Sequence, residues 1–331
     1  MSTLEVSMPM YITWVVLLLA VILVQTDASP GDRSIYYQEC TRNCISHFNC
    51  STRFGTFDWV RGNCFWCRYD CMWETVEYFE INFGKTPQFH GKWPFFAIPL
   101  PFGFVIQEPA SMIFSLMNLF TVYKMLRRFK EMRDLPNRTM WLIYAHVGLF
   151  TWISSSIFHM FDCDITEKMD YFGAYSYLLF AVYVSIVFTH PHLQYTQEGG
   201  WLIRCLQFMF MMIYFKHLYD MFINIDYGYN MMCCLALSVL ATGLYLWHLY
   251  FRKQNLGNLL EADILLVRLI VWANLATALE LLDFVPVFWI FDSHSLFHLA
   301  TVPIPIWWAD FLELAYDLDS STKKSSILKM A

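Results

Sequence analysis

Residues 140–161 read MWLIYAHVGLFTWISSSIFHMF, an apolar run without Asp, Glu, Lys or Arg. A run of about 20 apolar residues is long enough to cross a bilayer as a helix. Six further candidate spans lie along the chain, at residues 104–124, 170–190, 201–222, 228–250, 262–282 and 285–310. The runs lack the period-two alternation of barrel strands, and in lipid the backbone must satisfy its own hydrogen bonds. The sequence therefore predicts an all-α membrane protein with seven transmembrane helices.

The composition agrees with this fold class. The chain has 331 residues, of which 57% are hydrophobic and only 15% are charged, whereas soluble domains carry about 25% charged residues. Trp, Phe and Tyr make up 19% of the chain, and such aromatic residues are common at membrane interfaces. No basic stripe with interleaved aromatics occurs outside one membrane-flanking loop, so nothing indicates nucleic-acid binding.

The N-terminus has the pattern of a secretory signal peptide, predicted over residues 1–28. Its apolar core is YITWVVLLLAVILV at residues 11–24, and small residues around Ala28 suit cleavage. The run is short for a transmembrane helix, and polar sequence follows it. The alternative interpretation is an uncleaved anchor helix.

A cysteine-rich segment follows, predicted to be luminal and to cover residues 29–100. Six of the ten cysteines fall here, at Cys40, Cys44, Cys50, Cys64, Cys67 and Cys71. An even number after a signal peptide indicates disulfides in an oxidising compartment. Two pairs are spaced one helical turn apart, so two short helices joined by disulfides are expected. A zinc knuckle at the C-x-x-C of residues 64–67 is the less favoured alternative, and the Asn49 sequon predicts glycosylation.

Charges in the loops predict the orientation of the helices. The loop at residues 124–138 is strongly basic, whereas the loop at residues 162–170 is acidic. Because basic loops remain cytosolic, the N-terminal segment should be luminal and the tail at residues 316–331 cytosolic. A second sequon at Asn137 then lies on the cytosolic side, where it has no role.

Five polar residues in the predicted spans form a candidate site. Ser155 and His159 share a helix face at i, i+4, and so do His294 and His298. Asp170 opens the third predicted span. The orientation above puts all five near one luminal level, and ionisable residues in spans are functional candidates.

Three histidines can bind a zinc ion and leave a fourth position open, which is the catalytic pattern. A lone histidine in a membrane helix is more often a hydrogen-bonded interface residue, but three with an aspartate favour the metal. Glu280 and Asp283, near the luminal end of the sixth span, are either partners of the histidines or interfacial charges.

The sequence resembles the Per-like family of post-GPI-attachment factors, within the superfamily of alkaline ceramidases and adiponectin receptors. The matching stretches, found from about residue 36 to residue 315, are YYQEC (36–40), GKWPFF (91–96), SSSIFH (154–159), TEKMDYF (166–172), ALELLDF (278–284) and DSHSLFHLATVPIP (292–305). The segment after the last motif is less similar to the family than the motif itself.

The resemblance implies a function in fatty-acid remodelling of GPI-anchored proteins. It implies a hydrolase domain at residues 101–315 that removes the sn-2 acyl chain of the anchor and leaves a lyso-GPI. By the same resemblance His159, His294 and His298 hold zinc, and Asp170 binds or deprotonates the water that the metal activates. Ser155 positions that water or stabilises the oxyanion; without a G-x-S-x-G elbow, no acyl-enzyme is expected. Golgi membranes are the implied location, with the endoplasmic reticulum as the alternative.

Two other classes of function stay open from the sequence. A ceramidase-like amide hydrolase would share the metal site, although the large cysteine-rich segment favours a substrate that carries a protein. A non-catalytic seven-helix receptor or trafficking factor would need no open metal position. Lipid products measured with and without metal separate these classes.

Overall fold

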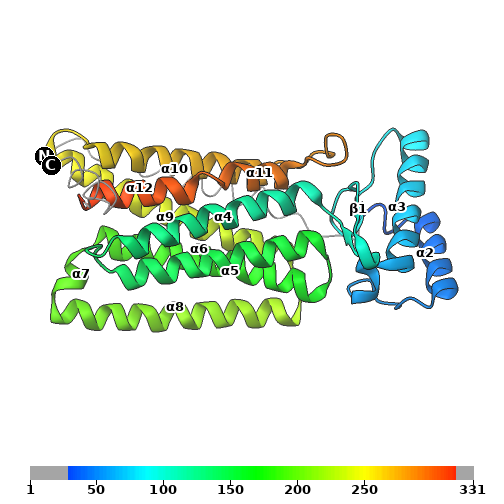
Figure 1. The fold of residues 1–331 in the computed structure, drawn as a ribbon, viewed down its shortest axis with the longest axis horizontal. Helices are drawn as coiled ribbons and strands as arrows, with labels where there is room; N and C mark the ends of the chain where they lie inside the picture. The colour runs from blue at the N-terminus through cyan, green and yellow to red at the C-terminus, as the bar shows by residue number, and fades with distance from the viewer. Residues whose placement is uncertain (1–28, 318–331) are drawn as a thin grey trace, which may run out of the picture.

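A small helical cap covers one end of a long bundle of helices (Figure 1). The structure, a computed structural model, describes residues 29–317. The predicted signal peptide and nearly all of the predicted cytosolic tail lie outside the described residues.

The cap is built on two helices that disulfides join. These are α2 (Ile35–Phe48) and α3 (Gly62–Phe83), with the 3₁₀ helix η1 (Phe57–Val60) between them. The disulfides are Cys40–Cys71, Cys44–Cys67 and Cys50–Cys64. Because the partners run in opposite order along the two helices, α2 and α3 are antiparallel. The two cysteines of the C-x-x-C bond to different partners, so the zinc-knuckle alternative is wrong.

Aromatic side chains complete the interior of the cap. Tyr37, Trp59 and Phe89 are buried against the disulfides. The chain then leaves the cap through a short hairpin, in which β1 (Ile98–Pro99) pairs with β2 (Val105–Ile106) across the 3₁₀ helix η2 (Pro101–Gly103). This hairpin leads directly into the first bundle helix.

Nine helices form the bundle in the described part of the chain. They are α4 (Pro109–Glu131), α5 (Arg138–Met160), α6 (Asp164–Thr189), α7 (His192–Tyr195), α8 (Gln197–Ile223), α9 (Tyr227–Leu256), α10 (Glu261–Glu280), α11 (Ser293–Thr301) and α12 (Ile304–Ala315). Four of them, α5, α6, α9 and α10, are each long and apolar enough to span a membrane. The predicted helical membrane fold is therefore present, while this criterion supports four of the seven predicted spans.

The seventh predicted span is not one helix. Residues 285–292 form a loop in which Phe288 and Trp289 have positive φ, and α11 then begins at Ser293. The helix ends before Pro303, which has no N–H to donate to the preceding turn, and α12 begins at Ile304. The prediction of one continuous helix over residues 285–310 was wrong for this reason.

Other boundaries also differ from the predicted ones. The first bundle helix begins at Pro109 rather than at residue 104, because Pro suits the first turn of a helix. The helix α6 begins at Asp164, six residues before the predicted start, with Cys163 as its N-cap. Asp170 therefore lies more than one turn inside α6 and does not open it.

Much of the predicted basic loop is helical. The helix α4 continues to Glu131, so the turn before α5 covers only residues 132–137. Arg128 is half-buried and pairs with Asp310 and Glu313 of α12. These pairs connect the last turns of α4 to α12.

The apolar core lies in the half of the bundle that is remote from the cap. Its fully buried members include Met125, Phe129, Trp141, Leu266 and Phe311. The half nearest the cap instead buries polar side chains of α4, α5 and α11. The fold thus encloses a polar centre beneath the cap, where the candidate site lies.

Candidate metal centre

His159, His294 and His298 come together beneath the cap. The Nε2 atom of His294 lies 3.3 Å from that of His159 and 3.0 Å from that of His298. His159 and His298 are buried and His294 is half-buried. Tetrahedral zinc with bonds of about 2.05 Å separates its ligand nitrogens by about 3.3 Å, so the three histidines have the spacing of a single metal site.

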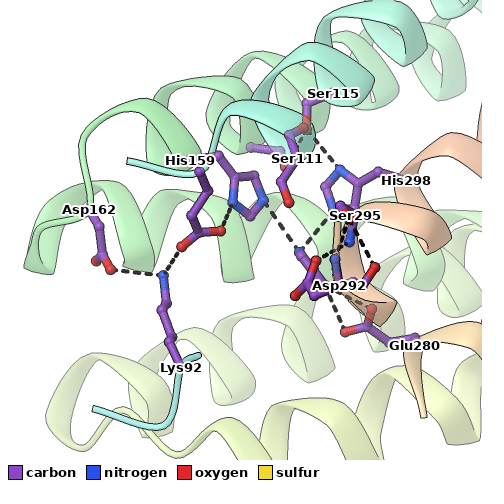
Figure 2. Close-up of polar contacts among 12 residues, drawn as sticks. Lys92, Ser111, Ser115, His159, Asp162, Glu280, Asp292, Ser295 and His298 are labelled. Carbon is purple, nitrogen blue, oxygen red and sulfur yellow. Dashed lines mark hydrogen bonds and ion pairs between the residues drawn. The ribbon is translucent and has the colours of Figure 1, made fainter. Parts of the chain in front are cut away.

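The start of α11 fixes two of these histidines. Asp292 accepts a hydrogen bond from the Ser295 backbone N–H at 2.9 Å, while the Ser295 hydroxyl accepts from the Asp292 N–H at 3.0 Å. This reciprocal capping box sets the first turn, as Figure 2 shows for the two side chains. His294 and His298 then project from the same face, one turn apart.

The third histidine is fixed where α5 ends beside the start of α4. The Glu108 backbone N–H donates to the carbonyl of His159 at 3.0 Å. Glu108 is the N-cap residue of α4, so the contact joins the two helix ends directly. His159 therefore lies at the corner where α5 ends against the start of α4.

Each histidine uses its other ring nitrogen in a second contact. The Nδ1 atom of His159 lies 2.6 Å from a Glu108 oxygen, and that of His294 lies 2.8 Å from a Glu280 oxygen. The Nδ1 atom of His298 lies 2.8 Å from the Ser115 hydroxyl. Figure 2 shows the Glu280 and Ser115 side chains against the histidines. Such partners orient metal-binding histidines and raise their basicity.

These contacts assign the tautomers. Carboxylates only accept hydrogen bonds, so Nδ1 of His159 and of His294 carries the proton. The Ser115 hydroxyl donates to the Ser111 carbonyl at 2.7 Å and so accepts from His298. With neutral rings, the three Nε2 atoms carry lone pairs that are directed toward one another and can share one cation. The donor set fits a divalent metal such as zinc.

A lysine of the cap segment continues the chain of contacts. The Lys92 ammonium donates to Glu108 at 2.7 Å and to Asp162 at 2.8 Å (Figure 2). Burial would lower the pKa of Lys92, but the two carboxylates outweigh it and hold that pKa well above its usual value. Burial likewise opposes ionisation of Glu108, yet Lys92 and His159 hold its pKa well below the usual range. Both groups stay charged at neutral pH.

Ser155 and Asp170 lie beside the histidines. The Ser155 hydroxyl is 3.1 Å from that of Ser115, and both side chains are buried. The Asp170 carboxylate interacts with the Ser155 hydroxyl and lies near His159 and His294. The fold therefore brings together all five residues of the predicted site, from α5, α6 and α11.

The two acidic residues predicted as partners of the histidines differ. Glu280 ends α10 and contacts His294. Asp283 instead accepts hydrogen bonds from Trp93 at 2.6 Å and from Gln88 at 3.3 Å, both in the cap segment. The backbone turn after α10 directs Asp283 to the cap, so of these two residues only Glu280 contacts a histidine within the described part of the chain.

The sequence interpretation missed four residues of the centre: Lys92, Glu108, Ser115 and Asn118. Asn118 donates to the backbone carbonyl of His298 at 2.7 Å. A signal was present, because Ser111, Ser115 and Asn118 follow the i, i+4, i+7 spacing of one helix face. For Lys92 and Glu108 no spacing relates them to the histidines.

Comparisons with known proteins identify the family. The model of the Per1-like family matches residues 55–315. The mouse protein named "GPI-specific phospholipase A2-like PGAP3" is 33% identical over 318 residues, which cover 90% of this chain and 92% of that protein. The Drosophila melanogaster protein "Post-GPI attachment to proteins factor 3" is 34% identical, covering 91% and 93%, and the Schizosaccharomyces pombe "Protein PER1 homolog" is 32% identical, covering 91% and 92%. No solved structure matches the chain. The chain belongs to the Per1-like family.

Proposed function

We propose that this protein is a zinc-dependent hydrolase that cleaves the sn-2 acyl ester of GPI anchors and leaves a lyso-GPI. The observation that carries the proposal is the convergence of three histidine Nε2 atoms whose Nδ1 atoms are all held by other side chains. Three protein ligands leave a fourth position open, as in catalytic rather than structural zinc sites.

Zinc at this position would supply Lewis acidity toward an ester carbonyl and would make water a nucleophile at neutral pH. Asp170, buried beside His159 and His294, would hold the attacking water and take its proton. The Ser155 hydroxyl would donate to the oxygen on which negative charge develops, or orient the water. Ser115 supports this step by holding both Ser155 and His298.

The substrate class comes from the relatives together with the cap. Two of the similar proteins carry names that specify a GPI-specific phospholipase A2-like protein and a post-GPI attachment factor. A disulfide-bonded cap directly above the metal centre suits a lipid whose head carries a glycan and a protein. An ester near the headgroup level would reach a site at the end of the bundle.

We further propose seven spans, with α4, α8 and the α11–α12 pair joining the four apolar helices. The cap and the metal centre would then face the lumen, and the basic end of α4 would face the cytosol. Golgi membranes are the proposed residence, with the endoplasmic reticulum as the alternative. The luminal leaflet exposes GPI anchors to such a site.

Fatty acid release tests the activity. Purified full-length protein in detergent would be incubated with a GPI-anchored protein that carries a labelled sn-2 chain. We expect free fatty acid and lyso-GPI, loss of both after chelation, and recovery with zinc. Ceramide in parallel serves as the competing substrate. Preferential ceramide cleavage, or release that survives complete metal removal, would refute the proposal.

A further inference from the structure

A cleft separates the cap from the mouth of the bundle. It has a volume of about 100 Å³, which is below the range of sites that enclose a whole drug-sized ligand but is enough for a compact group such as a phosphate. Its walls come from α2, α3 and residues 89–97, and it reaches Glu108 and Asp162 at the bundle. Because Glu108 also contacts His159, a single side chain separates this cleft from the metal centre.

Tyr37 and Arg68, which both line the cleft, make no side-chain hydrogen bond within residues 29–317. Tyr37 is 3% exposed, yet its hydroxyl makes no hydrogen bond there. Arg68 is half-buried and forms no ion pair in the same range; its guanidinium only lies over the Trp59 ring, 5.7 Å from the centroid. Neither side chain is held by a hydrogen bond within the described residues, so both groups can donate to a ligand in the cleft.

The charges along the cleft indicate the sign of that ligand. Near the bundle, Lys92 is shared between Glu108 and Asp162, so no positive charge is left over there. At the cap, Arg68 forms no ion pair within residues 29–317, and the carboxylate of Asp32 also lies near Tyr37. Burial raises the pKa of Tyr37 to about 12, with Arg68 opposing and Asp32 adding to the shift, so the hydroxyl remains a donor. A guanidinium beside a hydroxyl donor suits phosphate oxygens.

The remaining walls suit a sugar ring. Tyr69, Phe89 and Trp93 are among the residues that line the cleft, and aromatic side chains can pack against the C–H face of a polyol ring. A ligand with a phosphate at one end of the cleft and a ring along its wall would be a phosphorylated cyclic polyol.

We propose that this cleft binds the phosphoinositol head of the glycolipid, with its phosphodiester on Arg68 and Tyr37 and its ring on the aromatic wall. The inference rests on the proposed function, which brings a phosphoinositol lipid to the metal centre. Only the glycerol unit separates that phosphate from an sn-2 ester. The cleft thus selects the head while the histidines act on the acyl chain.

Calorimetry on the full-length protein in detergent tests the site without turnover. The probes are myo-inositol 1-phosphate, ethanolamine phosphate, inorganic phosphate and myo-inositol. We expect inositol phosphate to bind most tightly, and Arg68→Gln to weaken it roughly tenfold or more, as for a lost charge-assisted hydrogen bond. Tyr37→Phe keeps the buried ring and should weaken binding several-fold. Arg42→Gln, on the exposed face of α2, should bind like the wild type.

Three results would overturn the assignment. Inorganic phosphate binding as tightly as inositol phosphate would reduce the cleft to a general anion site, and tighter binding of ethanolamine phosphate would indicate a distal phosphate of the glycan. Unchanged affinity in folded Tyr37→Phe and Arg68→Gln proteins would exclude both residues.

Turnover separates this inference from the proposed function. With a GPI substrate, Arg68→Gln should raise KM and spare kcat, whereas a diacyl ester without a phosphate head should be cleaved as by the wild type. A wild-type protein that releases no fatty acid would refute the hydrolase, while the binding experiment would still decide the head site. Equal KM for wild type and Arg68→Gln on the GPI substrate would refute the head site alone.

Discussion

Lys92 of the cap segment donates a hydrogen bond to Glu108, whose second carboxylate oxygen accepts from His159. The cap is therefore connected to the metal centre through a single carboxylate. The orientation of His159, a candidate metal ligand, therefore depends on Lys92, which lies outside the bundle helices.

Removing the Lys92 ammonium should weaken the metal site. Lys92→Met leaves Glu108 buried without its cation, and disturbing such outer partners costs about 10- to 100-fold in metal affinity. Zinc affinity, measured by competition with a chromophoric chelator, should fall by that order. Lys85→Met, at an exposed position of the cap, is the matched control. Because an amide needs no counterion, Lys92→Met combined with Glu108→Gln should be better folded than Lys92→Met alone. Unchanged zinc affinity in Lys92→Met would contradict the coupling.

The histidines and Asp170 should separate metal binding from chemistry. His294→Ala or His298→Ala should lose most of the bound zinc, because two remaining ligands bind weakly. Asp170→Asn should keep the metal and lose activity, since it alters proton transfer more than coordination. Metal content by elemental analysis, paired with fatty acid release, checks both. Normal remodelling of GPI anchors by the histidine variants would contradict the hydrolase mechanism and favour a receptor or trafficking function.

The two acidic residues after α10 provide a matched pair. Glu280→Gln removes the carboxylate that accepts from His294, so zinc affinity should fall about tenfold or more. Asp283→Asn changes a group that contacts Gln88 and Trp93, and zinc affinity should stay at the wild-type value. Equal losses in both variants would show that Glu280 has no specific role at the metal.

The cap should depend on its three disulfides. Mass spectrometry after alkylation without reductant should find Cys40–Cys71, Cys44–Cys67 and Cys50–Cys64. Because Cys40–Cys71 closes the longest loop, with a sequence separation of 31, its removal should destabilise the cap by about 3–4 kcal/mol. Thermal unfolding of Cys40→Ser/Cys71→Ser measures this cost. Alkylation of most of the six cysteines in the native protein is the opposing outcome.

The proposed orientation predicts that protease will reach the C-terminus but not the cap. In sealed microsomes, added protease should remove a C-terminal tag and spare the cap, and Asn49 should carry a glycan. Asn49→Gln controls for the glycan, and detergent-opened microsomes control for the protease. A C-terminal tag that stays protected in sealed vesicles would reverse the topology.

The sequence determined the helical fold class, the disulfide-rich segment and five residues of the candidate site. Apolar runs and i, i+4 pairs are local patterns, so Ser155 and His159, or His294 and His298, share a helix face wherever the helix packs. The spacing of the cysteines on α2 and α3 likewise indicated two helices joined by disulfides. It did not determine which cysteines pair.

Only the tertiary structure decided which groups support the histidines. Lys92, Glu108 and Ser115 reach the centre from segments far away in sequence, and no local period relates them to α11. The break at Pro303 and the turn that takes Asp283 to the cap were also undetermined, because hydropathy averages over a loop between two apolar stretches. A contact between distant segments depends on how whole helices pack, which a pattern within one helix does not encode.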